Sequence, residues 1–312
     1  MTISGTRTPV AERPRHSCAF PVSDEQLWEM TAAWIADGLS SGERVTYFED
    51  GTAGAVLDRL ADDGVCVDDV LDEGRLEVVG SARTRAMLEG SLKDVREVVR
   101  ARIAAAVAAG HAGWRTTGQL SHALSVGRSL PDFDAALDDA LLGQPARALC
   151  LYDRYRHPED VVVALRAVHP YEVRIGAVYD DGLLRVTRVG LGRLRFAGEA
   201  DHSNHGTIDR LLHTAFDEVL RASGGPDEIV ADLSSLRFLD VAGAASLVGI
   251  ADRLPGTHRL VLHGVRPPLQ RVLDRCGAPF SPRLDVVPRE RPRSERRRAG
   301  TGEERVREGE RA

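Results

Sequence analysis

The chain has 312 residues, 43% of them hydrophobic, and a formal net charge of -6 at pH 7. This length allows two domains of ordinary size, and the apolar content is sufficient for two cores. The mildly negative charge argues against nucleic acid as a partner of the whole chain, and no apolar run is long enough to span a bilayer. We therefore expect a cytoplasmic protein that binds neither nucleic acid nor a membrane.

The residues that could catalyse a reaction or bind a metal show no spacing typical of a known site. The four cysteines are scattered without a C-x-x-C pair, which predicts neither a disulfide framework nor a zinc knuckle. The sequence also contains no Ser-His-Asp triad or carboxylate pair with a recognisable spacing. Our leading expectation is a protein that is not an enzyme and has no catalytic residues, metal or cofactor.

The two ends of the chain are predicted to be disordered tails. Residues 1–14 are polar and without periodicity, and residues 289–312 are charged without apolar anchors. Such segments cannot bury enough apolar surface to fold by themselves. The chain between them is predicted to form a first domain at 15–178 and a second at 182–288, joined at the turn signal Asp180-Asp181-Gly182.

The first domain alternates strand-like and helix-like segments. Strands are expected at 16–20, 44–48, 75–79, 113–116 and 146–152. Helices are expected from a cap at Ser23 or Asp24 to Gly38, and at 53–61, 92–109, 133–142 and 158–167. Alternation at this spacing predicts an α/β fold with a mainly parallel sheet covered by helices on both faces.

Five short phrases between residues 15 and 175 occur in an order that resembles the MEDS domain, a sensory module named after methanogen and methylotroph regulators. They are His16-Ser-Cys18, the run from Gly38 to Glu43, Gly113-Trp114-Arg115, the run from Cys150 to Arg154, and His169-Pro170. The resemblance implies a fold related to RecA/KaiC-type nucleotide-binding proteins. It also implies a role in sensing small hydrocarbon derivatives.

The loop after the second expected strand departs from a nucleotide-binding relative. An ATPase of this type would carry a glycine-rich loop ending in Gly-Lys-Ser or Gly-Lys-Thr, whose lysine neutralises phosphates. Residues 49–55 contain glycines but no lysine, and Glu49 and Asp50 would repel a triphosphate. We therefore expect a small neutral or aromatic ligand at the carboxyl ends of the strands, without ATP hydrolysis.

The candidate ligand-binding residues lie on or next to the expected strands and follow the MEDS-like phrases. Residues i and i+2 of a strand face the same side, so His16 pairs with Cys18, and Cys150 pairs with Tyr152. If their strands are neighbours, a cluster of two histidines and two cysteines, His16, Cys18, Cys150 and His169, could bind a soft metal or respond to oxidation. Packing alone is the third interpretation, because buried cysteines are often small core residues. The full candidate set is His16, Cys18, Arg115, Cys150, Tyr152 and His169.

The second domain begins with a hairpin, residues 183–189 and 192–198, in which apolar and basic residues alternate. This alternation predicts a half-exposed pair of strands. Further strands are expected at 229–239, 259–262 and 284–287, and helices at 207–222, after Asp240, and at 267–276. Asp240 is the expected N-cap of the central helix.

Residues 232–247, DLSSLRFLDVAGAASL, resemble the central segment of STAS domains, the fold of anti-sigma factor antagonists. The resemblance implies a STAS α/β fold whose central helix start binds an anti-sigma factor of the ATP-binding kinase type. The residues at or beside that contact are Asp232, Ser234, Asp240, Val241, Ala242 and Gly243. The family usually carries a phosphorylatable serine or threonine where this chain has Val241.

The sequence therefore predicts a signalling regulator with a MEDS-like sensor before a STAS output domain. Because a valine cannot carry phosphate, we expect a small ligand of the first domain to control partner binding in place of phosphorylation. Two alternatives stay open. The chain could be a non-phosphorylatable STAS scaffold that forms homo-oligomers in a signalling assembly. It could also be a metal or redox sensor that uses His16, Cys18, Cys150 and His169.

Overall fold

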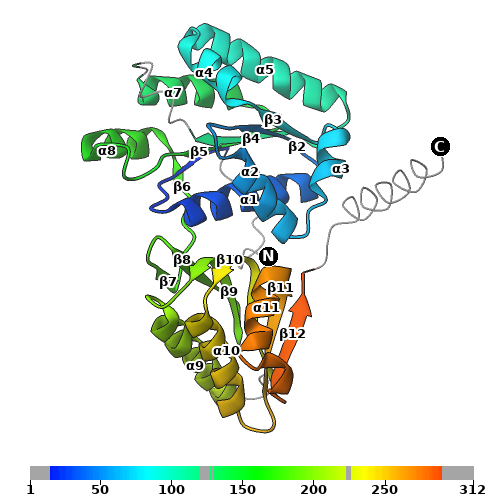
Figure 1. Cartoon of the computed structure of the whole chain (residues 1–312). Coiled ribbons are helices and arrows are strands. Elements are labelled where there is room, and N and C mark those ends of the chain that lie inside the picture. Colours follow the sequence, from blue (N-terminus) through cyan, green and yellow to red (C-terminus); the bar gives the residue numbers. More distant parts are fainter. Residues whose placement is uncertain (1–14, 120–126, 128, 223–225, 290–312) are drawn as a thin grey trace, which may run out of the picture. The chain divides into compact units, whose positions relative to one another are not determined.

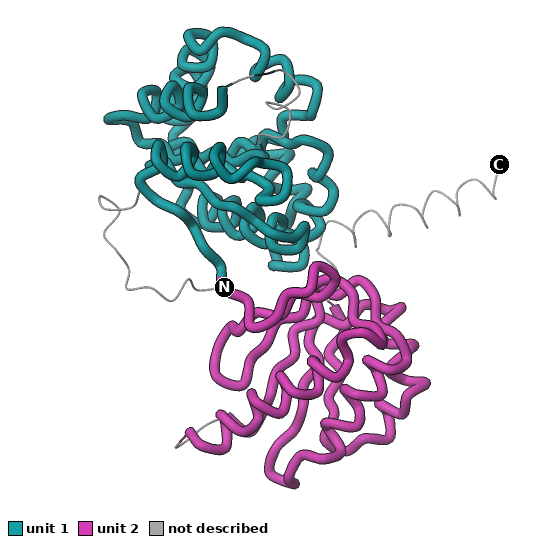
Figure 2. Tube along the Cα trace, turned by 90° about the vertical axis from the view of Figure 1, so that its left-hand side faces the viewer, with its two compact units in different colours: residues 1–175 teal, residues 176–312 magenta. Residues whose placement is uncertain are grey.

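The computed structural model describes residues 15–119, 127, 129–222 and 226–289. The chain separates into two compact units, Met1–Ile175 and Gly176–Ala312, which Figure 2 draws in two colours. The predicted tails, except for Arg15 and Arg289 beside them, lie outside the described residues. Within the described residues, no helix is both long and apolar enough to cross a membrane.

Unit 1 is built on a six-stranded sheet, which Figure 1 shows between layers of helices. Its strand order is β3-β2-β4-β5-β1-β6, and every neighbouring pair in it is parallel. β1 lies between β5 and β6, although more than 120 residues separate it from either along the chain. The strands are β1 (His16–Ala19), β2 (Arg44–Phe48), β3 (Leu76–Val79), β4 (Trp114–Gln119), β5 (Ala146–Leu151) and β6 (Tyr171–Glu172).

Helices cover both faces of this sheet, as the alternating pattern predicts. One face carries α1 (Asp24–Ser40), α2 (Ala53–Asp62) and α3 (Val67–Asp72). The other carries α4 (Ser81–Glu89), α5 (Leu92–Ala108), α7 (Leu130–Leu141) and α8 (Glu159–Val168). The connection after β1 therefore runs over one face and the connection after β5 over the other. This makes the boundary between β1 and β5 a topological switch point, where α/β sheets place their ligands.

Local chemistry explains where two of these helices begin. Ser23 caps α1 by accepting a hydrogen bond from the Gln26 amide, and Ser91 and Asp94 form a reciprocal capping box at the start of α5. The end of α1 corrects the prediction at Gly38. The helix continues to Ser40, and Gly42 with φ 75° supplies the left-handed turn instead. The short helices α3 and α4 were not expected from the sequence.

Unit 2 contains a mixed six-stranded sheet with the order β12-β11-β10-β9-β8-β7. The β7–β8 and β8–β9 pairs are antiparallel, and the other three pairs are parallel. The strands are β7 (Tyr179–Asp180), β8 (Leu184–Gly190), β9 (Arg193–Ala200), β10 (Glu228–Leu239), β11 (Arg259–Val265) and β12 (Leu284–Pro288). The helices are α9 (His205–Arg221), α10 (Val241–Arg253) and α11 (Pro267–Arg275), with a 3-10 turn, η2 (Ala278–Phe280).

The three helices of unit 2 share one contiguous apolar core with alternate residues of the strands, among them Val186, Phe196 and Leu233. The half-exposed hairpin that the sequence predicts is only partly correct. Arg188 and Arg193 are exposed, whereas Arg185 and Arg195 are buried. These two guanidinium groups pair with carboxylates of their own unit, Arg185 with Asp180 at 2.7 Å and Arg195 with Asp232 at 3.8 Å. Burying a cation is tolerable when such a partner compensates its lost hydration.

Candidate functional site

A cluster of buried polar side chains lies inside unit 1, on the face of the sheet covered by α7 and α8. β1 and β5 are direct neighbours, and their register places Cys18 opposite Cys150 and His16 opposite Ala148. The two same-side pairs predicted from strand periodicity therefore share one face. The His16 imidazole Nε2 lies 3.4 Å from the Cys150 Sγ, and both residues are buried.

Asp134 of α7 completes the cluster, and the sequence analysis missed it. Its side chain is fully buried, and its Oδ2 accepts a hydrogen bond of 2.5 Å from the Tyr152 hydroxyl. Its Oδ1 lies 4.0 Å from His16 Nε2. A signal was present, because residues 130, 134, 137 and 141 have the spacing of one helix face and the other three are leucines. A carboxylate on an apolar stripe is rarely buried without a partner or a role.

His169 enters the cluster from the C-terminal end of α8. Its Nδ1 lies 2.7 Å from the Leu165 carbonyl oxygen, so this nitrogen carries the proton and donates it. The opposite ring nitrogen, Nε2, consequently has a free lone pair, and it lies 3.8 Å from Asp134 Oδ1. The imidazole rings of His169 and His16 are 4.3 Å apart between centroids. One donor atom each of His16, Asp134, Cys150 and His169 lies within 4.8 Å of all the others.

Burial controls the protonation of this cluster. Burial, with a smaller contribution from the neighbouring His169, lowers the pKa of His16 to about 3, so the imidazole is neutral at physiological pH. Burial also raises the pKa of Asp134 to about 7 and lifts the pKa of the Cys150 thiol well above its ordinary range. The cluster thus holds neutral imidazoles, a protonated thiol and a carboxyl group that is poorly ionised.

An apolar cavity of about 30 Å³ adjoins the cluster at Cys150. This volume accommodates one or two atoms of water size. Its walls come from β2, β4, β5, α4, α5 and α7, and they include Phe48, Val95, Trp114, Phe133 and Leu137. Because these walls are apolar, the cavity suits a small apolar group better than an ion.

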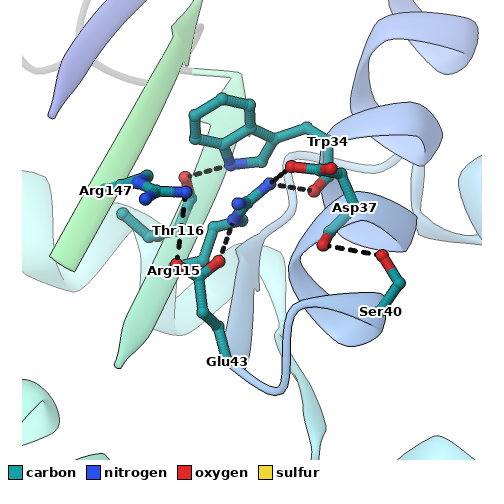
Figure 3. A network of polar contacts seen from close by, with 7 residues as sticks. All are labelled: Trp34, Asp37, Ser40, Glu43, Arg115, Thr116 and Arg147. Carbon is teal, nitrogen blue, oxygen red and sulfur yellow. Dashed lines mark hydrogen bonds and ion pairs between the residues drawn. The ribbon is translucent and has the colours of Figure 1, made fainter. Parts of the chain in front are cut away.

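Arg115, another candidate ligand residue, lies on the opposite face of the sheet. It is in register with Val45 and Arg147, under α1, whereas Cys150 faces α7. Its guanidinium group is buried and fully engaged: Nε donates to Glu43 at 2.5 Å, and Nη1 donates to Asp37 at 2.7 Å (Figure 3). Arg115 therefore fastens α1 to the sheet and is not part of the polar cluster.

Two neighbours complete this arginine network. The Trp34 ring lies 4.6 Å from the Arg115 guanidinium carbon, and its indole nitrogen donates to the Thr116 carbonyl (Figure 3). Gly38 leaves room for the arginine, because a Cβ at this position would lie 2.6 Å from Arg115 Cδ. The glycine that the sequence suggested as a helix end is thus a packing residue inside the helix.

The loop after β2 uses its own carboxylate where a nucleotide-binding protein would hold a phosphate. Glu49 accepts hydrogen bonds from the backbone amides of Gly51 at 2.5 Å and Ser81 at 2.6 Å. Amides engaged by a carboxylate are not available to an anion, and the carboxylate itself would repel one. This geometry supports the expectation that the loop does not bind a triphosphate.

The second candidate site is the start of α10 in unit 2. Asp240 is its N-cap and accepts a 2.7 Å hydrogen bond from the Gly243 amide. Val241, the first residue of the helix, is 68% exposed, and Phe238 at the end of β10 is 48% exposed. Two large apolar side chains therefore face solvent within four residues of each other.

The remaining predicted contact residues of unit 2 are less accessible. Ser234 is buried, and both its amide and its hydroxyl bond to Asp232 Oδ1. Gly243 is buried as well, while Ala242 is half-buried. Ser234 therefore shapes the irregular stretch of β10 between Asp232 and Ser235, and Val241 is the most exposed residue of the predicted surface.

Family comparisons agree with both units. The model of the MEDS domain, the methanogen/methylotroph, DcmR sensory domain, matches residues 15–170. The chain belongs to the MEDS family. A STAS domain model matches residues 185–288, so a STAS domain follows the MEDS domain in the chain. Both families and their order are as the sequence resemblances predicted. No curated protein matches the chain.

The MEDS domain thus brings together five of the six residues that the sequence proposed for ligand binding and leaves Arg115 outside. Cys18 faces Cys150 across the strand pair, but it is not one of the four clustered donors. Burial raises the pKa of the Cys18 thiol to about 12, with a smaller effect of Glu172, and this makes it a poor nucleophile. A ligand-binding role for the five residues stays a prediction.

Proposed function

We propose that this MEDS–STAS protein is a signalling regulator whose STAS domain binds an anti-sigma factor and thereby releases a sigma factor. The observation that carries the proposal is the exposed apolar start of α10, where Val241 and Phe238 flank the Asp240 cap. Exposed apolar side chains next to a rigid helix start are suited to the buried centre of a protein–protein interface.

Val241 determines how such a partner could be controlled. A hydroxyl at this position could accept a phosphate, whose charge would disrupt an apolar interface, but a valine offers no acceptor atom. Phosphorylation at position 241 therefore cannot switch this surface. Control must come from elsewhere in the chain, and the MEDS domain, with its buried polar cluster and adjoining cavity, is the proposed sensor.

A small ligand can exert this control only if it favours one functional state of the chain over another. Tight binding with equal affinity for both states would leave the affinity for the anti-sigma factor unchanged. A tenfold change in that affinity corresponds to a difference of about 1.4 kcal/mol between the two states. The cavity beside Cys150 is small and apolar, which supports a compact ligand of low polarity.

The test uses purified full-length protein and purified anti-sigma factors of the ATP-binding kinase type from the native host. We expect one of them to bind, and Val241→Glu to weaken that binding by at least about tenfold, because it buries a charge in the interface. Val189→Glu is the matched control, since Val189 is a similarly exposed valine on β8 of the same domain. Affinities come from titration calorimetry.

If the anti-sigma factor bound Val241→Glu and Val189→Glu with equal affinity, the start of α10 would not be its contact surface. Absence of binding to every kinase tested, together with stable oligomers of the purified chain on sizing, would favour the scaffold function instead. Val241 is compatible with that second function, because a scaffold needs no phosphorylation switch.

A further inference from the structure

We propose that His16, Asp134, Cys150 and His169 form a closed binding site for one divalent transition-metal ion of the zinc class inside the MEDS domain. This inference departs from the sequence-based expectation of no metal. It concerns the interior of the sensor and stands whether or not the STAS domain binds an anti-sigma factor.

The spacing of the donor atoms fits a tetrahedral ion. Zinc–nitrogen and zinc–oxygen bonds of about 2.0 Å and a zinc–sulfur bond of about 2.3 Å place tetrahedral donors roughly 3.3–3.5 Å from one another. His16 Nε2 lies 3.4 Å from Cys150 Sγ and 4.0 Å from Asp134 Oδ1, and His169 Nε2 lies 3.8 Å from the same oxygen. The donor atoms are spread over as much as 4.8 Å, so side-chain movements of about 1 Å would bring all four to one ion.

Two of the donor atoms are buried and have no hydrogen-bond partner among the described residues. These are Asp134 Oδ1 and His169 Nε2, and both side chains are completely buried. Buried polar atoms without a partner are rare because their desolvation is not compensated. Both atoms point toward the same group of donors, and a bound cation would satisfy them at once.

Neighbouring groups hold the free donor atoms in place. The Tyr152 hydroxyl occupies Asp134 Oδ2 and leaves Oδ1 facing the cluster. The Leu165 carbonyl accepts from His169 Nδ1 and leaves Nε2 facing it. Metal-binding histidines and carboxylates in proteins usually carry such hydrogen bonds on the atom that does not bind the metal.

The donor types indicate the class of ion. Two imidazoles, one thiolate and one carboxylate suit zinc and similar transition metals, whereas magnesium and calcium take oxygen donors almost exclusively. The Cys150 proton would leave to solvent as the metal–sulfur bond forms. A divalent cation then balances one thiolate and one carboxylate, so the occupied site is neutral, as its burial requires. With four protein donors the site has no open position, which is typical of a structural or regulatory ion.

The geometry argues against a redox role of the same residues. Reactive thiols are accessible and have lowered pKa values, whereas Cys150 is buried and its thiol is held protonated by burial. Of the alternatives that the sequence left open, metal binding therefore fits the structure better than oxidation.

The first experiment measures metal in the full-length protein, purified without chelators, by elemental mass spectrometry. We expect about one zinc-class ion per chain in the wild type and in the controls Cys66→Ala and Asp132→Asn. Cys66 lies at the start of α3, and Asp132 is an exposed residue in the first turn of α7, so neither touches the cluster. Cys150→Ala and Asp134→Asn should contain little or no metal. Retention of metal by these two variants at the level of the controls would overturn the proposal.

A second readout does not depend on the folding of any variant. The wild-type protein is stripped of metal and titrated with Co²⁺, whose tetrahedral complexes with a thiolate absorb both in the visible range and in the near ultraviolet. We expect both bands at one equivalent of cobalt. Their absence in folded wild-type protein would refute the site even if Cys150→Ala failed to fold.

Tyr152 is the positioning residue of this site, and Tyr152→Phe tests it. The variant keeps the ring but loses the hydroxyl that fixes Asp134. We expect the affinity for Zn²⁺ to fall by about 10–100-fold, as is usual for outer hydrogen-bonding partners of a metal site. The cobalt bands should persist at higher cobalt concentration. An affinity equal to that of the wild type would show that the hydroxyl does not orient Asp134 for a metal.

Discussion

The two units of this chain use similar secondary structure in opposite ways. The MEDS unit has helices on both faces of its sheet and places its unusual chemistry in the interior, where His16, Asp134 and His169 are buried. The STAS unit has one contiguous apolar core and places its unusual residues, Val241 and Phe238, in solvent. In the proposed function, an interior site suits ligand binding and an exposed apolar surface suits partner binding.

Two aspartates illustrate the contrast. Asp240 is half-buried at a helix N-terminus, where the Gly243 amide compensates its charge and the residue supports a surface. Asp134 lies in the middle of a helix and is fully buried, one of its oxygens has no hydrogen-bond partner in the part of the chain that the structure describes, and burial raises its pKa to about 7. A fold keeps such a group against its own stability only when another function requires it.

The largest effect is expected from the buried arginine of the MEDS unit. Arg115→Leu removes the ion pairs with Glu43 and Asp37 and leaves the buried Glu43 with only the longer contact to Arg147, 3.5 Å away. We expect the free energy of unfolding to fall by about 3–5 kcal/mol. Tryptophan fluorescence during denaturant unfolding measures it, because all three tryptophans, Trp28, Trp34 and Trp114, lie in this unit.

The control for that comparison is Arg156→Leu, which removes a more exposed ion pair with Asp153 and should cost no more than about 1 kcal/mol. A loss of similar size in both variants would mean that the polar interior of the MEDS unit contributes no more to stability than its surface does. The contrast between the interiors of the two units would then rest only on the buried polar cluster around Asp134.

A smaller effect is expected from a glycine in the STAS unit. Gly264 of β11 has φ 72°, and a Cβ there would lie 2.1 Å from the Ser234 hydroxyl oxygen. Gly264→Ala should cost about 1–3 kcal/mol, because it adds backbone strain and a steric clash. Far-UV circular dichroism should show earlier unfolding of this unit while the tryptophan transition of the MEDS unit stays in place.

Gly256→Ala is the matched substitution, since Gly256 has nothing within 4 Å of the added Cβ and no left-handed backbone. Gly256→Ala should change the free energy of unfolding by no more than about 1 kcal/mol. If Gly264→Ala also shifted the tryptophan transition, the two units would not unfold independently.

The smallest effect concerns pH. Hydrogen bonds from the Ser203 hydroxyl and amide hold the pKa of Asp201 below its ordinary value. A lowered folded-state pKa contributes stability that is present above the unfolded-state value near 3.8 and is lost as pH falls through the lower folded value. The stability difference between wild type and Ser203→Ala should therefore shrink as pH is lowered from 7 to about 3. Urea midpoints of the STAS transition measure it.

Ser246→Ala, on α10, is the control for this measurement. The stability difference between this variant and the wild type should not vary with pH. A constant difference for Ser203→Ala would show that the Asp201 carboxylate is not held by Ser203. Because Asp201 is half-buried and lies outside the apolar core, this test examines polar contacts of the STAS unit without disturbing that core.

Much of the fold followed from local sequence. Strand periodicity placed His16 with Cys18 and Cys150 with Tyr152, because the side-chain direction alternates with every residue. Capping chemistry predicted helix starts at Ser23 or Asp24 and at Asp240, since a side-chain oxygen at a cap satisfies free amides of the first turn, and the structure selects Ser23 and Asp240. The resemblance to two families also gave the order of the domains correctly.

Strand periodicity and helix capping could not predict contacts between distant segments of the chain. The neighbourhood of β1 and β5 depends on strand order, and the face occupied by Arg115 depends on the register of β4, which local periodicity does not specify. Asp134 became part of the cluster only because α7 packs over β5 and turns that position inward.

The sequence by itself thus determined most of the longer elements, their periodicity, the two families and the absence of a phosphate acceptor at Val241, because each depends on a residue and its near neighbours. Only the tertiary structure decided which buried groups meet. It placed Arg115 among carboxylates on one face and gathered His16, Asp134, Cys150 and His169 on the other. Such a cluster depends on packing between elements more than 100 residues apart, which no local pattern encodes.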